Sequence, residues 1–423
     1  MSIEKIIKSI TINKSITIKN PELFNGISTS DVCLDESYVY VTSSNTVVLL
    51  RKEELEFVSS ISLPSSSIWR CVAHKGKLYL VGTKTVVRIS QDLKQLEEKP
   101  LFPQKSRVDR FFIPYCVTTY DDRLLAVGMF FNEYKGSYTA TVAKIDTDSL
   151  ELEDLQSGAT YSSIIKCTPI YSVAVDPNTD YVWAVGASSN QNMLCIDILD
   201  FKNRENVLSK TLHDFGIGID VAFDPQGNAY VITHDKNLLK LGKMFLGLEL
   251  LKLGYKQERE LAELAINKSP LNMMPLSIVY ANGFVALLAV ETAQHPKVII
   301  YDEDLKEVDK LDLIPQVPLL GGKLLFDGKK IFAALTGSLS TIIYSIHSIS
   351  TGLLIDIIVD NTIERINAYQ YRDKQLSDMI YMCCGKKEFT EIYVFDGVEL
   401  KKVDVNEKVE NVLKSSVKFI YVV

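Results

Sequence analysis

The stretch GIDVAFDPQGNAYVIT, residues 218–233, combines two apolar runs with a polar break at Asp-Pro-Gln-Gly-Asn. Pro225 presets φ for the first central position of a turn, and Gly227 and Asn228 tolerate positive φ. Val, Ile, Tyr and Phe, which are enriched in strands, flank the break. The stretch therefore predicts a β-hairpin.

The same plan recurs along the chain: an apolar strand, a polar turn and a second apolar strand. Its other occurrences are residues 32–43, 71–82, 116–128, 172–186, 277–290, 323–337 and 367–385. A second hairpin follows each one, at residues 46–58, 85–98, 140–155, 193–207, 237–253, 297–311, 341–357 and 391–405. In these second hairpins an apolar strand precedes a more polar one, as expected if the last strand of each unit faces solvent.

Repeats of four short strands, spaced roughly 40–58 residues apart, are typical of β-propeller blades. Packing blades in a ring buries faces that a single blade cannot bury. The sequence therefore predicts an all-β fold, a β-propeller of four-stranded antiparallel blades, with eight blades favoured and seven as the alternative. A large sandwich or two stacked barrels are the other architectures considered. We expect a single propeller domain over residues 1–423.

Three segments fall outside the regular units. Strand-like pieces at residues 10–18 and 417–422 are candidates for closing the ring, because terminal strands often pair within one blade of a propeller. Residues 256–270, KQERELAELAINKSP, form a candidate helical or loop insertion between the fifth and sixth units.

The sequences VAFDPQGNAYV (221–231) and VAVDPNTDYVWAV (173–185) resemble the NHL-type and YVTN-type propeller repeats. In those repeats an apolar strand meets Asp-Pro, a small-residue turn and an aromatic-rich second strand. The resemblance is at superfamily level and covers two units well. It implies a fold that serves as an interaction platform, a lactonase or another hydrolase, and so fixes no activity.

Composition excludes several classes of protein. A net charge of −7 argues against general nucleic-acid binding, which needs a concentrated basic face. The N-terminus does not resemble a signal peptide, and the apolar runs are too short to form a transmembrane helix. Seven cysteines without a C-x-x-C pair predict reduced, buried thiols and a cytoplasmic location.

No catalytic motif occurs: the sequence contains no nucleophile elbow, P-loop, dinucleotide fingerprint or metal-binding histidine pair. RVDRFFIPY (107–115) interleaves basic and aromatic residues, but it is more typical of an inner strand with its preceding loop than of a nucleic-acid contact. Cys383 and Cys384 are interpreted as residues of a buried strand rather than a redox-active pair.

The residues that precede the innermost strands are the remaining candidates, because they face the centre of a propeller. Asp31, Asp220 and Asn367 are candidate ligands for a hard cation such as Ca²⁺. Arg70, Arg110 and Tyr171 form a candidate binding rim, whose arginines suit a carboxylate or phosphate of a partner. The third interpretation is that the acids and arginines pair with one another across the rim.

We therefore expect a non-catalytic, soluble scaffold that binds other proteins through the loops and rim of the propeller. A metal-dependent hydrolase of the lactonase type is the rival interpretation, and a structural component of a larger assembly is the third. No cofactor is expected, apart from the Ca²⁺-like ion of the rival.

Overall fold

A computed structural model describes residues 3–7, 12–19, 31–65, 67–102, 110–132, 137–157, 165–188, 191–242, 266–291, 295–313, 319–337, 340–346, 351–359, 362–369, 380–386, 389–395 and 400–403. The chain divides into two compact units, one of residues Thr11–His347 and one of residues Met1–Ile10 with Ser348–Val423. Among the described residues, no helix is long and apolar enough to cross a bilayer.

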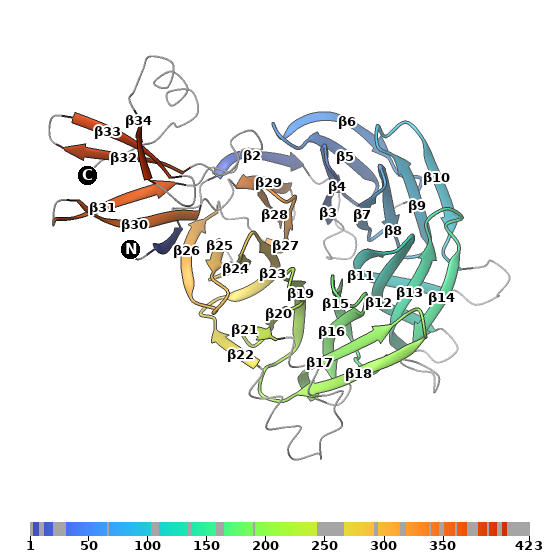
Figure 1. Cartoon of the computed structure of the whole chain (residues 1–423). Coiled ribbons are helices and arrows are strands. Elements are labelled where there is room, and N and C mark those ends of the chain that lie inside the picture. Colours follow the sequence, from blue (N-terminus) through green and yellow to red (C-terminus); the bar gives the residue numbers. More distant parts are fainter. Residues whose placement is uncertain are drawn as a thin grey trace. The chain divides into compact units, whose positions relative to one another are not determined.

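The larger unit is an all-β propeller of seven four-stranded antiparallel blades (Figure 1). Blades 1 and 2 are β3 (Asp31–Leu34), β4 (Tyr38–Thr42), β5 (Thr46–Arg51), β6 (Glu56–Ser62), then β7 (Arg70–His74), β8 (Lys77–Val81), β9 (Thr85–Ser90) and β10 (Leu96–Pro100). Blades 3 and 4 are β11 (Arg110–Tyr120), β12 (Arg123–Asn132), β13 (Ser137–Asp146), β14 (Leu152–Ser157), then β15 (Ile170–Val175), β16 (Val182–Ser188), β17 (Gln191–Asp200) and β18 (Glu205–Leu212).

The remaining three blades follow in chain order. Blade 5 is β19 (Gly218–Phe223), β20 (Ala229–Thr233), β21 (Asn237–Leu241) and β22 (Ile266–Pro270). Blade 6 is β23 (Met274–Ala281), β24 (Phe284–Val290), β25 (Pro296–Tyr301) and β26 (Glu307–Asp312). Blade 7 is β27 (Leu319–Phe326), β28 (Ile331–Gly337), β29 (Ser340–Ile346) and, as its outermost strand, β2 (Ile12–Lys19).

The ring closes through its inner strands and through β2. Each inner strand contacts the next, from β3 to β27, and β27 contacts β3 again. β2 pairs antiparallel with β29, from Ile12 opposite Ile346 to Lys19 opposite Ser340. The sequence predicts a closing strand at residues 10–18, and β2 occupies that position; residues 417–422 lie outside the described residues.

The smaller unit contains one six-stranded sheet in the order β1-β30-β31-β32-β33-β34. Its strands are β1 (Ile3–Ile7), β30 (Thr351–Val359), β31 (Thr362–Tyr369), β32 (Ile380–Lys386), β33 (Phe389–Phe395) and β34 (Leu400–Val403). Cys383 and Cys384 lie on β32. One domain over residues 1–423 stays a prediction for the whole chain.

The prediction of eight blades is therefore wrong, because β29 pairs with β2 rather than with β30. Residues 341–357 look like a hairpin, but β29 pairs with β28 and β2, whereas β30 pairs with β31 and β1. β2 takes the fourth place in blade 7. β30 to β34 form a six-stranded sheet with β1 instead of an eighth blade. In blade 5 the fourth strand is β22, so residues 266–270 of the predicted insertion are a strand; residues 256–265 are not among the described residues.

Aspartates hold the turns between the first two strands of several blades. The Asp224 carboxylate, 1% exposed, accepts hydrogen bonds from the Asn228 backbone N–H at 2.8 Å and the Tyr230 hydroxyl at 3.3 Å. Gly227 adopts a φ of 86°, which a residue with a side chain rarely adopts. The break in the opening stretch is thus a turn closed by its own aspartate.

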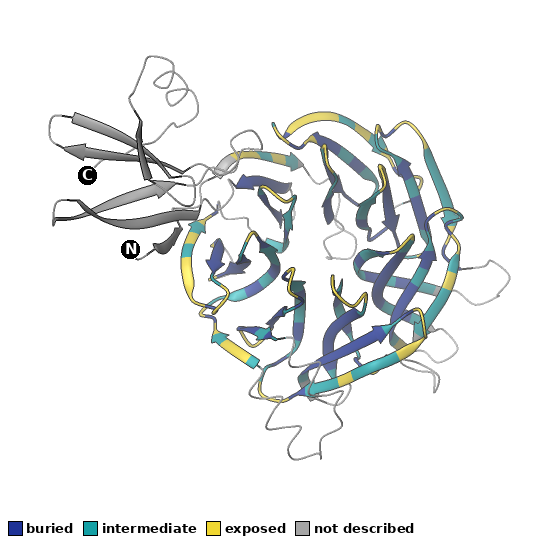
Figure 2. Ribbon diagram, in the orientation of Figure 1, coloured by how far each residue is buried: buried dark blue, intermediate teal, exposed yellow. Residues whose placement is uncertain are grey.

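Burial follows strand position within each blade (Figure 2). The second strands are buried along almost their whole length, as in β20 and β24, because they lie between neighbouring blades. The fourth strands alternate or are mostly exposed, as in β6 and β26. The hydrophobic clusters lie between blades; one unites β4 and β5 of blade 1 with β7 to β9 of blade 2 around the fully buried Trp69.

Candidate binding site at the centre of the ring

One residue of every inner strand occupies the same position, four residues before the turn that leads to the second strand. These seven residues, which we call the inner ring, are Asp31, Arg70, Cys116, Ser172, Asp220, Ser277 and Lys323. Most of them are polar, although the strands that carry them are otherwise apolar. Their side chains connect one blade to the next.

Asp31 connects three blades. Its carboxylate accepts hydrogen bonds from the Val32 N–H at 2.8 Å in its own blade and from the Cys71 N–H at 2.9 Å in blade 2. Lys323 of blade 7 donates to it at 2.8 Å. Burial would raise the pKa of Asp31, but the positive charges of Lys323 and Arg70 outweigh it and lower that pKa.

Lys323 and Arg70 flank this carboxylate with different geometries. Burial would lower the pKa of Lys323, but the negative charge of Asp31 outweighs it, so the pKa is raised and the amine stays charged. Arg70 donates through Nε to the Tyr115 carbonyl at 3.0 Å and through Nη1 to the Trp69 carbonyl at 2.9 Å. Backbone carbonyls thus hold the guanidinium in place.

Asp220 organises the opposite set of blades in the same way. It accepts hydrogen bonds from the hydroxyls of Ser172 at 2.6 Å and Ser277 at 3.1 Å, and from the N–H groups of Ile278 at 3.1 Å and Val221 at 2.9 Å. The Ser277 hydroxyl in turn accepts from an N–H of blade 7, that of Leu324. Burial raises the pKa of Asp220.

Two stacked tyrosines precede the inner ring in blades 3 and 4. The pairing of β11 with β12 skips Tyr115, and that of β15 with β16 skips Tyr171, so each is the extra residue of a β-bulge. Their rings stack with centroids 5.5 Å apart and interplanar angle 28°. Both residues are half-buried, and they place an aromatic surface beside Arg70.

The structure places the predicted site residues as follows. Asp31, Arg70 and Asp220 belong to the inner ring, and Tyr171 comes one residue before its member Ser172. Arg110 is the first residue of β11, and its side chain is outside the described part. Asn367 lies on β31 of the six-stranded sheet. The inner ring thus combines two of the three candidate cation ligands, and each accepts hydrogen bonds from its own donors.

Sequence reasoning missed Cys116, Ser172 and Lys323. In blades 3, 4 and 7 a β-bulge adds a residue near the start of the inner strand, so counting from the start of the strand places the ring residue too early. A signal was present: in blades 1, 4, 5 and 7 the ring residue comes four positions before the turn aspartate, at Asp35, Asp176, Asp224 and Asp327. Counting back from that aspartate would have found Ser172 and Lys323.

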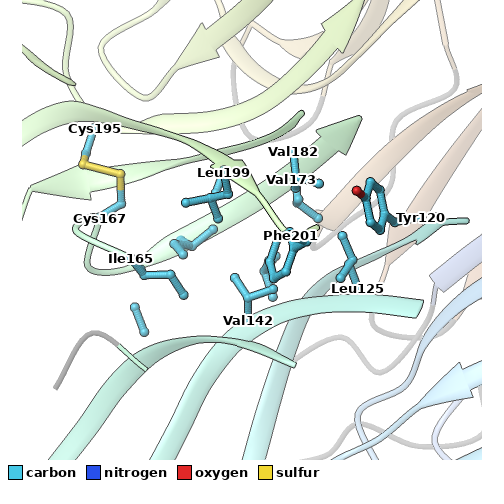
Figure 3. Close-up of a cluster of buried hydrophobic side chains, with 14 residues drawn as sticks. Tyr120, Leu125, Val142, Ile165, Cys167, Val173, Val182, Cys195, Leu199 and Phe201 are labelled. Carbon is cyan, nitrogen blue, oxygen red and sulfur yellow. A yellow bond between two sulfur atoms is a disulfide. The ribbon is translucent and has the colours of Figure 1, made fainter. Parts of the chain in front are cut away.

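A disulfide joins Cys167 to Cys195 within blade 4, in the hydrophobic cluster between blades 3 and 4 (Figure 3). The prediction of reduced thiols is wrong for this pair, because the fold brings together two residues that lie 28 positions apart. Cys33, Cys71 and Cys116 are free. Cytoplasmic localisation stays a prediction.

Asp197 lies beside the two sulfurs, and the three side chains together have the composition of a metal site. The Asp197 carboxylate, however, already accepts hydrogen bonds from the backbone N–H groups of Lys166 and Cys167, at 2.7 and 2.8 Å. The hydroxyl of Ser209 donates to its other oxygen at 2.6 Å. This buried carboxylate therefore holds the segment that enters blade 4.

A second aromatic group lies in blade 3 where β11 and β13 begin and β12 ends. Phe111 stacks on Phe131 with centroids 4.9 Å apart, and the half-exposed Tyr138 contacts both rings. Phe112, the next residue, is fully buried. The described part of RVDRFFIPY is thus the beginning of an inner strand, as its apolar residues indicate.

Comparisons with known proteins show the fold. No family model and no curated protein matches the chain. Among solved structures, the β-propeller domain of Cps50 (Swd1) from Myceliophteria thermophila has a TM-score of 0.52 at 12% identity, over 79% of this chain and 99% of that chain. YCF48 bound to D1 peptide has a TM-score of 0.52 at 12% identity, over 81% of this chain and 98% of that chain.

BamB from Moraxella catarrhalis has a TM-score of 0.45 at 11% identity, over 79% of this chain and 98% of that chain. At these identities, the structures with a TM-score of 0.52 are similar to this chain in fold alone. The larger unit of the chain, residues Thr11–His347, is a seven-bladed β-propeller.

Proposed function

We propose that this chain is a non-catalytic scaffold that binds another protein at the centre of the propeller, on the face where the inner strands begin. The carrying observation is the half-buried Tyr115–Tyr171 stack beside Arg70 on a ring of rigid strands. Tyrosine and arginine are enriched among the residues that dominate protein interfaces, because they offer large contact areas with little loss of conformational entropy.

Two further points support a protein partner. YCF48, which is similar in fold, is described as bound to a D1 peptide. The acids of the inner ring are engaged by donors of neighbouring blades, which favours a structural role for them over metal chemistry. We also propose that the repeats are of the NHL or YVTN type, which residues 173–185 and 221–231 resemble. A metal-dependent hydrolase and an assembly component stay predictions.

Affinity capture from extracts of the source organism tests the proposal. The full-length wild type is compared with a Tyr115→Ala, Tyr171→Ala double variant and with Phe57→Ala. Phe57 is a matched control because it is 61% exposed on β6, an outer strand. We expect a stoichiometric partner with the wild type and the control, and its loss with the double variant. Equal capture by all three proteins would contradict the proposed site.

A further inference from the structure

We infer that the centre of the ring binds a carboxylate of the partner polypeptide between Arg70 and Lys323, with the neighbouring residue of the partner on the Tyr115–Tyr171 stack. This inference rests on the proposed function and names the chemistry that the site recognises. Three observations carry it: the unused donors of the two cations, the local excess of positive charge and the adjacent aromatic surface.

The hydrogen-bonding capacity of this part of the ring is unevenly used. Both oxygens of Asp31 already accept hydrogen bonds, Oδ1 from Val32 and Lys323 and Oδ2 from Cys71. Within the described residues, Arg70 uses two of its five N–H groups. Lys323 uses one of the three donors on its amine. Arg70 and Lys323 therefore have more N–H donors than the described residues provide acceptors, and a ligand with acceptor atoms can bind these donors.

Charge favours an anionic acceptor. Two cations face the single carboxylate of Asp31, and the Lys323 side chain is 35% exposed, so a ligand can reach it. A guanidinium held at Nε and Nη1 still presents Nη2, and its planar geometry matches a carboxylate. The same two positive charges disfavour a metal cation here.

The rest of the ring restricts where the carboxylate binds. Asp220 is negative when ionised and already accepts four hydrogen bonds, so that side offers an anion little. The Tyr115–Tyr171 stack lies next to Arg70, and neither phenol hydroxyl has a partner within the described residues. We therefore expect an apolar or aromatic residue beside the recognised carboxylate.

The carboxylate of a polypeptide has two sources, its C-terminus and the side chains of Asp and Glu. The probes are four pools of random octapeptides on an array. Two pools have a free C-terminus and two are amidated; within each pair, one pool contains Asp and Glu and the other lacks them. Labelled full-length protein is bound to all four, and the best peptide is then measured by fluorescence anisotropy.

We expect no binding to the amidated pool without Asp and Glu, and binding to at least one other pool. Whichever of the other pools bind identifies the source of the carboxylate. Replacing the carboxylate of the best peptide by an amide should weaken binding about tenfold or more, the usual effect of a charged hydrogen bond. Arg70→Gln should weaken it by a similar factor.

Arg51→Gln is the matched control, because Arg51 is an arginine with a 60% exposed side chain on β5, away from the inner ring. It should bind the peptide as the wild type does. Lys323→Gln removes the cation that donates to Asp31, whereas Lys323→Arg keeps a positive charge there. Compared as folded proteins, Lys323→Gln should weaken binding more than Lys323→Arg does. Tryptophan fluorescence verifies that each variant is folded.

Three results would overturn the inference: no binding to any pool, equal binding to carboxylate and amide peptides, or unchanged binding by folded Arg70→Gln. These outcomes are separable from failure of the proposed function. If Arg70→Gln still captures the natural partner while the Tyr115→Ala, Tyr171→Ala variant does not, the scaffold proposal stands and the carboxylate site falls.

Discussion

Glycines on the second strands make room for the bends of the inner strands. Gly186 pairs with Ile170, next to the bulge of β15, and Gly128 pairs with Pro114, next to that of β11. A methyl group on Gly186 would collide with the carbonyl oxygen of Pro169, and one on Gly128 with that of Ile113. Val-Gly pairs at the ends of the hairpins thus mark places where two backbones approach closely.

Gly186→Ala should therefore destabilise the propeller by about 2–3 kcal/mol, as overpacking against backbone does. Gly321→Ala is the control, because a methyl group there meets nothing within 4 Å, and it should change stability by less than about 0.5 kcal/mol. Urea unfolding followed by tryptophan fluorescence measures both, since Trp69 and Trp183 are buried in the propeller. Equal midpoints for the two variants would contradict the explanation.

At the scale of elements, the N-terminal strands complete two different sheets. β2 supplies the fourth strand of blade 7, and β1, which precedes it in the chain, pairs with β30 of the six-stranded sheet. Ile16 and Ile18 of β2 pack against the cluster between blades 7 and 1, whereas Ser15 is exposed. Alternate residues of β2 therefore face the hydrophobic cluster and the solvent.

Ile16→Lys should loosen the closing strand, because it removes apolar packing and brings a charge to the cluster. We expect a loss of about 1–2 kcal/mol, or a fall in Tm of about 1.5–3 °C for a domain of this size. Ser15→Lys adds the same charge on the exposed side of β2 and should leave Tm close to that of the wild type. Thermal unfolding followed by tryptophan fluorescence distinguishes the two; an equal effect of both would show that β2 does not close the ring.

Local pattern predicted the hairpins well, because turn chemistry and period-two alternation are properties of neighbouring residues. It could not predict which sheet a strand joins. Residues 341–357 have the pattern of a hairpin, yet β29 and β30 belong to different sheets. β29 pairs on one side with the neighbouring β28 and on the other with β2, which lies more than 300 residues before it in the sequence. Such long-range pairing leaves no signal in a local repeat, and it explains why an eighth blade was wrongly predicted.

The site shows the same division. Asp31, Arg70 and Asp220 were predicted at the centre because they directly precede an apolar run. Tyr171 was also a candidate, as part of the binding rim, but Tyr115 was not. Tyr115 is the extra residue of a β-bulge, and a bulge shifts the register without changing the alternation enough to be recognised. The Cys167–Cys195 disulfide depends on a contact between β17 and the segment before β15, which spacing alone does not predict.

At the scale of the whole ring, closure depends on charge as well as on β2. Among the residues that the structure describes, three ion pairs join blade 7 to blade 1: Lys323 with Asp31 at 2.8 Å, Lys52 with Asp327 at 3.1 Å, and Lys330 with Glu53. The Lys52–Asp327 pair is almost fully buried, its side chains being 9% and 3% exposed. Burial would raise the pKa of Asp327, but hydrogen bonds from its turn and the charge of Lys52 outweigh it and lower that pKa.

The pKa values of Asp31 and Asp327 are both lowered by folding, so these carboxylates stabilise the ring above their unfolded pKa of about 3.9. That stability is lost as the pH falls through their lower folded values. The contribution of Asp220 to stability changes with pH in the opposite direction. Folding raises the pKa of Asp220, so protonation of this residue in acid favours the folded form. The ring junction between blades 7 and 1 should therefore be the acid-sensitive one.

Asp327→Asn should lower stability at pH 7 by about 3 kcal/mol, since it leaves Lys52 buried without its counter-charge. The difference from the wild type should shrink as the pH falls below about 3.9, because the unfolded wild type then binds a proton at Asp327, and it should vanish only as the pH passes through the lower pKa of the folded state. Asp214→Asn, in an exposed turn at a positive φ that asparagine also adopts, is the control and should match the wild type throughout. Urea midpoints from pH 7 to pH 3 measure this. A difference that stays constant with pH would show that the Lys52–Asp327 pair acts through packing rather than through charge.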